Sequence, residues 1–378
     1  MNAGKENFKP IKVGVMGLKN GHADGMFTAM KNNPLFEVVA LSLDPETRCK
    51  FEDRYGNTDL FKDYDTFCDD EEMVKKHPEL ELCICGGSNA EHFRQFKLCA
   101  ERKINVVMMK VPTLDMAEYA EMLRLEKESG IKVSIELEMR WYAAVERIKE
   151  LIGQNVFGEL TAINAYNYSH FPMWWNHWMN DPKESYGKVV PLKPDSNKFR
   201  GGALTDHPHI FDLVRYMTGS EFESVYAETA PNMRDSAAVE DMVYVIGKLK
   251  NGVVVSLDPS YANKEYEQSR MVLKKDRLSH YPKSVQVEMQ VCGTEGGAIC
   301  DLYNPNTTEQ MRFEDLEYRV NTRFYDVSGT RKAYMERFAR AIRGEEYTPD
   351  FTLFDHEKTM RVVNACYESI YTGKTVKL

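Results

Sequence analysis

Residues 12–22, which read KVGVMGLKNGH, decide the fold of the first part of this chain. The first five residues form a short apolar run typical of a buried strand, and a glycine-containing turn follows directly. A helical pattern then covers residues 22–31. A strand that ends in a glycine turn and opens a helix is the local context of a dinucleotide site, because the backbone can approach a pyrophosphate at the helix N-terminus.

The same alternation of strands and helices continues to about residue 140. Further strands are expected at residues 37–43, 80–85, 104–109 and 132–137, and helices at residues 69–76, 90–101 and 116–127. Short buried strands that alternate with helices are typical of βαβ units. We therefore predict an N-terminal Rossmann domain with a doubly wound parallel sheet.

The pattern changes after residue 140. A helix is expected at residues 141–153, followed by strands at 160–168, 224–229, 242–250, 253–259 and 285–292 and a helix at 209–217. Asn251-Gly252 separates two alternating apolar runs, which is a strong hairpin signal. We predict an α/β domain at 1–139 and an α+β domain at 140–378, built on an open antiparallel β-sheet with helices on one face. The last helices, beginning near Lys332 and Asp355, could pack back on the first domain.

Length and composition narrow the class of protein. The chain has 378 residues, 43% of them hydrophobic and 28% charged, which suits two folded domains. Its net charge of −9 makes nucleic acid a poor partner. No stretch approaches the roughly 20 apolar residues that span a bilayer, and the N-terminus lacks the features of a secretory signal. Eight scattered cysteines without zinc-type spacing predict reduced thiols and a cytoplasmic protein.

The glycine turn departs from the usual dinucleotide fingerprint. Only Gly17 keeps its place; Lys19 and His22 occupy the positions of the other two glycines, and Gly21 comes one residue early. Lys19 could neutralise a phosphate or block its approach. Asp44 ends the second strand, where a carboxylate would accept hydrogen bonds from ribose hydroxyls and disfavour a 2′-phosphate. The turn predicts NAD, with NADP less favoured, while an ordinary strand–turn–helix stays the alternative.

The order of these motifs resembles the Gfo/Idh/MocA family of NAD(P)-dependent oxidoreductases, the glucose-fructose oxidoreductase and inositol dehydrogenase type, over nearly the whole chain. The resemblance implies a Rossmann domain and a C-terminal sheet domain that holds substrate and often mediates oligomers. It places Asn89 and His92 along the cofactor. The cofactor-binding residues expected in all are Gly17, Lys19, Asn20, Gly21, His22, Asp44, Asn89, His92 and Lys110.

The family's Glu-Lys-Pro signature is altered here to Met109-Lys110-Val111-Pro112. Counting forward from His92 puts Lys110 on the signature lysine and makes Val111 an insertion. Counting back from the next helix puts Val111 there instead. We favour the first count because a strand fixes register more firmly than a turn, and Lys110 is then the catalytic lysine that the resemblance implies.

A second motif covers residues 201–212, GGALTDHPHIFD. It resembles the family's glycine-rich stretch followed by Asp-x-x-x-His, with one residue missing before His209. The resemblance implies that His209 is the general base and that Asp206 orients or tunes the catalytic groups. Two alternatives stay open. In one, Asp206 caps the helix, with Pro208 in the first turn. In the other, Asp206, His207 and His209 bind a divalent metal, although we expect a site without metal.

An aromatic segment, residues 168–178, precedes this motif. Indole faces with neighbouring Asn and His donors suit a sugar ring, and packing at a subunit interface is the alternative. Arg140 looks like the family's Arg after the last Rossmann strand. The expected substrate residues are Arg140, Trp141, Tyr168, Trp174, Trp175, Asn176, His177 and His207.

Together these features predict an NAD(H)-dependent oxidoreductase acting on a ring secondary alcohol of a sugar, a sugar derivative or a cyclitol. One alternative is a redox-neutral glycosidase, which oxidises C3 transiently, eliminates the aglycone and retains its NAD. Another is a catalytically inactive binding or regulatory subunit. The resemblance further implies a homodimer or homotetramer formed through the C-terminal sheet, with no membrane partner.

Overall fold

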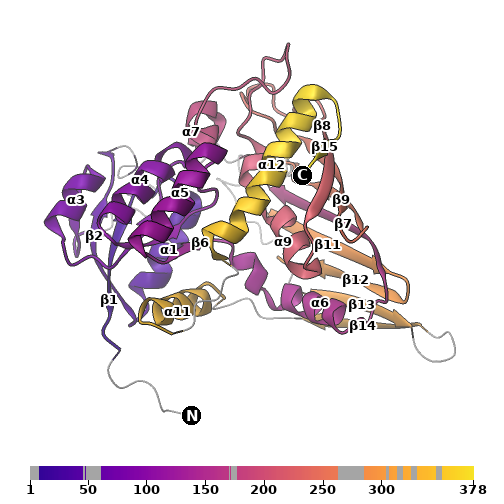
Figure 1. The fold of residues 1–378 in the computed structure, drawn as a ribbon, viewed down its shortest axis with the longest axis horizontal. Helices are drawn as coiled ribbons and strands as arrows, with labels where there is room; N and C mark the ends of the chain where they lie inside the picture. Colours follow the sequence, from indigo (N-terminus) through magenta and orange to yellow (C-terminus); the bar gives the residue numbers. More distant parts are fainter. Residues whose placement is uncertain are drawn as a thin grey trace, which may run out of the picture. The chain divides into compact units, whose positions relative to one another are not determined.

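The computed structural model describes residues 8–45, 47, 61–169, 171, 177–262, 285–303, 306–312, 318–324, 330–345 and 351–378 (Figure 1). The chain forms two compact units: Met1–Glu136 with Gly329–His356, and Leu137–Ser328 with Glu357–Leu378. The chain first leaves the first unit after Glu136, close to the boundary expected after residue 139. It returns there with helix α11 (Thr330–Ile342), which contacts α1.

The first unit contains a six-stranded parallel sheet with the order β3-β2-β1-β4-β5-β6. Its strands are β1 (Ile11–Met16), β2 (Phe36–Ser42), β3 (Asp65–Phe67), β4 (Leu82–Cys85), β5 (Asn105–Met108) and β6 (Val133–Ile135). This order belongs to the Rossmann fold and reverses between β1 and β4, where such sheets bind ligands. The predicted Rossmann fold is thus confirmed.

Helices follow the strands of this sheet as the sequence predicts. They are α1 (Gly21–Lys31), α3 (Asp70–Lys76), α4 (Asn89–Glu101) and α5 (Met116–Ser129). Polar side chains define their starts: Asn20 accepts from the His22 N–H, Asp69 from the Glu72 N–H, and Asp115 from the Ala117 N–H. Strand β4 is buried along its whole length, as expected for a strand covered on both faces.

The second unit contains a nine-stranded mixed sheet with the order β14-β13-β12-β11-β7-β10-β9-β8-β15. Its strands are β7 (Leu160–Ser169), β8 (Phe222–Thr229), β9 (Val243–Leu249), β10 (Val254–Asp258), β11 (Val285–Gly293), β12 (Gly296–Asp301), β13 (Asn306–Arg312), β14 (Tyr318–Phe324) and β15 (Val376–Lys377). All pairs are antiparallel except β7 with β10. The antiparallel prediction therefore holds for most of the sheet and fails at this pair, which no hairpin joins.

Helices cover one face of this sheet. Those with contacts to its strands are α6 (Ala143–Gly153) and α9 (His209–Thr218). The other helices are η1 (Glu138–Trp141), η2 (His177–Asn180), α7 (Pro182–Tyr186), α8 (Ala203–Asp206) and α12 (Leu353–Thr372). Helix α9 contacts β7, and α6 contacts β12 and β13 (Figure 1). On the other face, Tyr244, Ile246 and Val254 are 47%, 59% and 48% exposed. Within the described residues, this face of β9 and β10 therefore leaves apolar side chains exposed.

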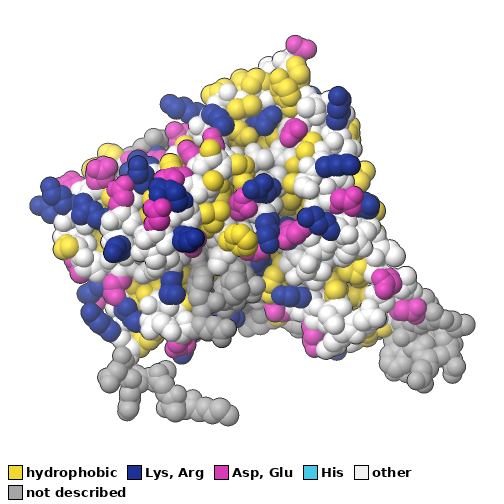
Figure 2. Space-filling model, in the orientation of Figure 1, with side chains coloured by type: hydrophobic (Ala, Val, Ile, Leu, Met, Phe, Trp, Pro, Cys, Tyr) yellow, Lys and Arg dark blue, Asp and Glu magenta, His cyan; other side chains and the backbone are white. Residues whose placement is uncertain are grey.

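The distribution of charged side chains and the state of the cysteines agree with the sequence composition. On the face of the first unit seen in Figure 2, basic and acidic side chains are intermixed rather than sorted by sign. The cysteines within the described ranges are free thiols, and Cys83, Cys85, Cys99 and Cys366 are fully buried. No helix among the described residues has the length and apolar character required to cross a bilayer.

Candidate functional site

The first unit presents a turn that begins with glycine where the strand order reverses. Gly17 follows β1 with φ +77°, and its N–H donates to the Ser42 carbonyl at 2.8 Å. A Cβ at Gly17 would lie 3.2 Å from the backbone of Gly87. The loops after β1 and β4 thus approach so closely that a side chain on Gly17 would be both strained and crowded.

A cavity opens at this edge of the sheet. Its lining comes from the ends of β1, β2, β3 and β4 and from α3 and α4: Gly17, Lys19, Ser42, Asp44, Cys68, Asp69, Asp70, Gly87, Glu91, Arg94 and Gln95. The structure thereby brings the predicted residues Gly17, Lys19 and Asp44 to one site. A bare glycine turn at a helix N-terminus and a carboxylate at the end of β2 fit the pyrophosphate and the adenosine ribose of a dinucleotide.

Asp44 is fixed by its own loop. Its two carboxylate oxygens accept from the N–H and the hydroxyl of Thr47, at 2.9 and 2.5 Å. Each carboxylate oxygen can accept a further hydrogen bond, so this contact orients Asp44 without using its full capacity.

The floor of the cavity is held by a buried network around Asp70. This carboxylate accepts from the Ser42 hydroxyl, from Arg94 at 2.5 Å and from Gln95 at 3.2 Å. The Gln95 amide also donates to the Met16 carbonyl at 3.0 Å. The ends of β1 and β2 are therefore tied to α3 and α4 around the place where we expect the cofactor.

Lys110 lies after β5, and the backbone of Lys110 and Val111 is held by two residues that the sequence assigned to the cofactor. Asn20 Nδ2 donates to the Lys110 carbonyl at 3.1 Å, and His92 Nδ1 lies 2.7 Å from the Val111 carbonyl. The Lys110–Val111 peptide is cis. Lys110 is only 5% exposed, and among the described residues it joins Asn20 and His92 in one cluster.

The tautomer of His92 follows from this contact. A carbonyl only accepts, so Nδ1 must carry the proton. Burial lowers the pKa of His92 despite the Val111 contact, so the ring is neutral at pH 7. Nε2 is then an acceptor, is fully buried, and has no hydrogen-bond partner in the described structure. An orphaned buried nitrogen at this edge of the sheet is available to a ligand donor.

Three other predicted cofactor residues lie in less open surroundings. The His22 ring is directed to Glu136, 2.9 to 3.0 Å away, and Glu136 is also 3.4 Å from Arg331. Asn89 is the first residue of α4 and is 6% exposed. Gly21 is the first residue of α1. Neither His22, Gly21 nor Asn89 is in the lining of the cavity described above.

In the second unit, the Gly201-Gly202 turn is built on a buried carboxylate. Glu240 accepts from the Gly202 N–H at 3.0 Å, from the Leu204 N–H at 3.2 Å and from the Tyr367 hydroxyl at 2.6 Å. A Cβ on Gly202 would lie 1.8 Å from the Glu240 carbonyl oxygen, so only glycine fits. Burial raises the pKa of Glu240 to about 7, although these hydrogen bonds oppose the shift.

Asp206 ends α8 and accepts from the Tyr261 hydroxyl at 3.0 Å. Burial and the negative charge of Asp206 hold the pKa of Tyr261 well above its usual value. His207 lies beside this pair: its Nδ1 is 2.5 Å from the Pro259 carbonyl and its Nε2 is 2.9 Å from the Ser169 hydroxyl. Both ring nitrogens of His207 thus face protein groups rather than a substrate.

His209 begins α9 and is 2% exposed. The residue that caps α9 is Pro208, which makes no side-chain cap. Because Asp206 lies in α8 rather than at the start of α9, the alternative that Asp206 merely caps that helix is wrong. The two short helices instead place Asp206 and His209 on either side of a tight turn.

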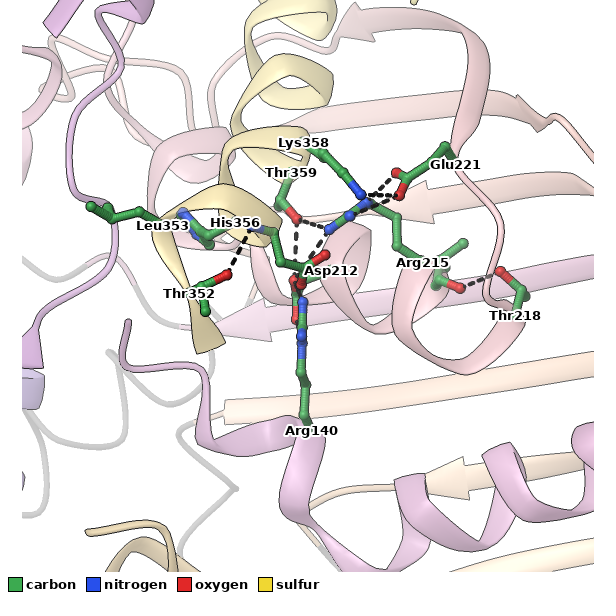
Figure 3. A network of polar contacts seen from close by, with 12 residues as sticks. Arg140, Asp212, Arg215, Thr218, Glu221, Thr352, Leu353, His356, Lys358 and Thr359 are labelled. Carbon is green, nitrogen blue, oxygen red and sulfur yellow. Dashed lines mark hydrogen bonds and ion pairs between the residues drawn. The ribbon is translucent and has the colours of Figure 1, made fainter. Parts of the chain in front are cut away.

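Arg140 is the centre of a buried ionic network (Figure 3). Its Nε and Nη2 donate to the two oxygens of Asp212 at 2.6 and 2.5 Å, and the side chains are 2% and 1% exposed. The Thr359 hydroxyl donates to Asp212 at 3.1 Å, and Arg215 donates to Thr359 at 2.8 Å. One edge of the Arg140 guanidinium is therefore committed to joining η1 to α9.

Tyr168 lies on the open face of the sheet, opposite the face where Ser169 contacts His207. Residues along a strand alternate between faces, so Ser169 reaches His207 while Tyr168 points away. Tyr168 instead donates to Asp258 at 2.9 Å and stacks on Tyr166 at 4.5 Å.

The other aromatic candidates give less information. Trp141 ends η1 and is half-buried. Trp174, Trp175 and Asn176 lie outside the described residues, and so does the side chain of His177 at the start of η2.

Sequence reasoning missed several residues of these clusters, among them Glu91, Glu240, Tyr261 and Tyr367. Glu91 was visible as the acidic third residue after Ser88, a capping-box pattern. Glu240 and Tyr367 lie far from the Gly201-Gly202 turn in sequence, so no local pattern connects them. Tyr261 follows β10 after Pro259-Ser260 and gives no periodic signal.

The fold and these clusters define a protein with a Rossmann dinucleotide-binding unit and a second, mixed-sheet unit. Residues 145–299 match the model of the GFO/IDH/MocA C-terminal domain. The chain is 24% identical over 309 residues to the uncharacterized oxidoreductase YrbE of Bacillus subtilis, covering 80% of this chain and 79% of that protein. It is 26% identical over 401 residues to scyllo-inositol 2-dehydrogenase (NADP(+)) IolW of the same organism, covering 99% and 98%.

A solved structure has the same fold at low sequence identity. An inositol dehydrogenase homolog from Azotobacter vinelandii, complexed with NADH and myo-inositol, superposes with a TM-score of 0.73 at 14% identity, covering 98% of each chain. Residues 145–299 thus match the C-terminal domain of the Gfo/Idh/MocA family, and the chain is similar to oxidoreductases in sequence and in fold over most of its length.

Proposed function

We propose that this protein is an NAD(H)-dependent oxidoreductase that acts on a ring secondary alcohol of a sugar, a sugar derivative or a cyclitol. The observation that carries the proposal is the Lys110 cluster beside the dinucleotide-binding edge. In this cluster Asn20 holds the carbonyl of the buried Lys110, and His92 contacts the carbonyl of the next residue, Val111. The names of the relatives support the substrate class, since they include inositol and D-xylose dehydrogenases.

Two groups would act on the alcohol proton. His209 would act as general base, while the ammonium of Lys110 would stabilise the developing alkoxide. Asp206, held by Tyr261, would tune the charge near His209. Bound NAD would supply a hydride acceptor, held at Gly17, Lys19 and Asp44. The chemistry asked of the protein is therefore proton removal and alkoxide stabilisation.

A substrate panel tests the proposal. We expect sugars or cyclitols with free ring hydroxyls to give NADH, detected by nicotinamide absorbance, and His209→Ala to lower kcat strongly while NADH binding persists. A glycoside panel run in parallel detects aglycone release, which would indicate the redox-neutral glycosidase. A protein that binds NADH but turns over neither panel would indicate a binding subunit. A fully active His209→Ala variant would refute the assignment of the base.

We propose NAD rather than NADP because of Asp44, whose carboxylate would repel a 2′-phosphate. Replacing Asp44 with Asn removes this charge while keeping size and an acceptor. We expect the NAD-to-NADP preference in kcat/KM to fall about 10- to 100-fold, the range for losing a charged hydrogen bond. Glu37→Gln, at the start of β2, serves as the control. A wild-type preference for NADP would contradict this assignment.

We further propose a homodimer or homotetramer formed by the open face of the nine-stranded sheet. Tyr244, Ile246 and Val254 expose apolar surface on its neighbouring strands β9 and β10. Ile246→Lys would place a charge in the interface core, and we expect a lower molecular mass by light scattering at micromolar concentration. A substitution at exposed Phe354 of α12 is the control. An unchanged mass for Ile246→Lys would exclude this face. A reduced, cytoplasmic protein is consistent with the buried free thiols.

A further inference from the structure

The turn after β1 carries a lysine whose ammonium is already paired. Lys19 Nζ lies 2.9 Å from Glu91 Oε1, and the two side chains are 25% and 30% exposed. Glu91 is in the first turn of α4, so the pair joins the loop after β1 to the helix after β4. These are the two connections that flank the reversal of strand order.

Glu91 is held in place by a second role. Its Oε2 accepts from the Ser88 N–H at 2.7 Å and completes the capping box of α4. Burial would raise the pKa of Glu91, but the Ser88 hydrogen bonds and the Lys19 ammonium outweigh it and lower the pKa overall. The carboxylate is therefore ionised at neutral pH and fixed beside the ammonium.

The pair lies on the cavity assigned to the dinucleotide. Lys19 and Glu91 line it together with Gly17, Gly87 and Asp44. Within that lining the other cation is Arg94, which is bound to Asp70 at 2.5 Å. A pyrophosphate brings two negative charges, and the N-terminus of α1 offers only about half a positive charge. Lys19 is thus the side chain of the glycine turn that can neutralise the pyrophosphate, and Glu91 competes for the same ammonium.

We propose that the Lys19–Glu91 ion pair is an electrostatic clasp that sets how long the dinucleotide stays bound. Lys19 holds the pyrophosphate, and Glu91 weakens that hold by sharing the ammonium. The inference rests on the dinucleotide dependence proposed above. Its consequence is that removing the two charges changes cofactor release in opposite directions, whereas a merely structural ion pair would loosen the site from either side.

Two variants of the full chain separate these cases. Glu91→Gln removes the charge and keeps an acceptor for the Ser88 N–H, because Gln also completes a capping box. Release of NADH is followed by stopped-flow fluorescence against an excess of unlabelled competitor. We expect release to be about 3- to 10-fold slower in Glu91→Gln and about 3- to 10-fold faster in Lys19→Met, the range for one charge-assisted contact. Added salt should accelerate release less in Lys19→Met than in the wild type.

The control is Glu37→Gln, which removes an acid from the Lys12–Glu37 pair outside the cavity lining and should leave release unchanged. In the Lys19→Met background, Glu91→Gln should have a smaller effect; an equal effect would show that Glu91 acts without Lys19 and would overturn the clasp. Faster release in both single variants, or no change in either, would also overturn it. Wild-type protein that binds no NADH would overturn the proposed function and the clasp together.

Discussion

Replacing Lys110 with Met is expected to lower kcat by about 100- to 10,000-fold, the range for losing a positioned acid–base or alkoxide-stabilising group. Lys110 is 5% exposed, and its carbonyl is fixed by Asn20, so the side chain begins from a rigid point. Met keeps the apolar stem and its volume. The loss should therefore fall on kcat, with the dissociation constant of NADH changed only a little.

A matched control makes this result specific. Lys97→Met removes an exposed lysine of α4 that pairs with Glu101 one helical turn away, and its activity should equal that of the wild type. Lys110→Arg keeps the charge in a bulkier group and should recover part of the activity. If Lys110→Met kept more than about a tenth of kcat, a loss of under about 1.4 kcal/mol in barrier terms, the alternative register that aligns Val111 with the signature lysine would be favoured.

The second large effect is on stability, at the buried Arg140–Asp212 pair. Asp212→Ala would leave the Arg140 guanidinium charged and 2% exposed without its carboxylate. Losing one partner of such a pair costs about 3–5 kcal/mol, because the remaining charge is desolvated without compensation. We expect a large fall in the urea midpoint for unfolding of the second unit, measured by tryptophan fluorescence and circular dichroism.

The double variant Arg140→Met with Asp212→Leu is the control for that prediction. Replacing both ions with apolar groups of similar size is often close to neutral for stability. The double variant should therefore unfold much nearer the wild-type midpoint than Asp212→Ala does. If the two variants were equally destabilised, the cost would come from lost packing of η1 on α9 rather than from an unpaired charge.

The sequence predicts the first unit well because its signals are local. A buried strand, a glycine turn and a capped helix follow one another within residues 12–31, and the pattern recurs at β4–α4 and β5–α5. Strand β3 (Asp65–Phe67) escaped because only three mostly exposed residues form it.

Strand β13 of the second unit escaped for a different reason. Its inward residues Thr307 and Glu309 are polar and fully buried, and Glu309 accepts from Arg147 of α6. Hydrophobic periodicity cannot detect a strand whose buried side is an ion pair.

Local sequence patterns also predict one part of the candidate site and not the other. Asn20, His92 and Lys110 each follow a strand of the parallel sheet, so their gathering at one edge could be expected from the strand pattern. The residues that hold the clusters of the second unit come from distant segments of the chain. Glu240 precedes β9, and Tyr261 follows β10. The pleat of β7 also separates Tyr168 from Ser169, which residue types alone do not reveal.

The most direct test of the account is to bind NADH to the purified protein and then identify any nicotinamide that the native protein already carries. We expect saturable NADH binding that competes with NAD, together with NADH formation from at least one sugar or cyclitol. Cofactor released only on denaturation, with aglycone release from glycosides, would favour the redox-neutral reaction. No binding at millimolar NAD(H) or NADP(H) would contradict the proposal that this protein is a nicotinamide-dependent oxidoreductase.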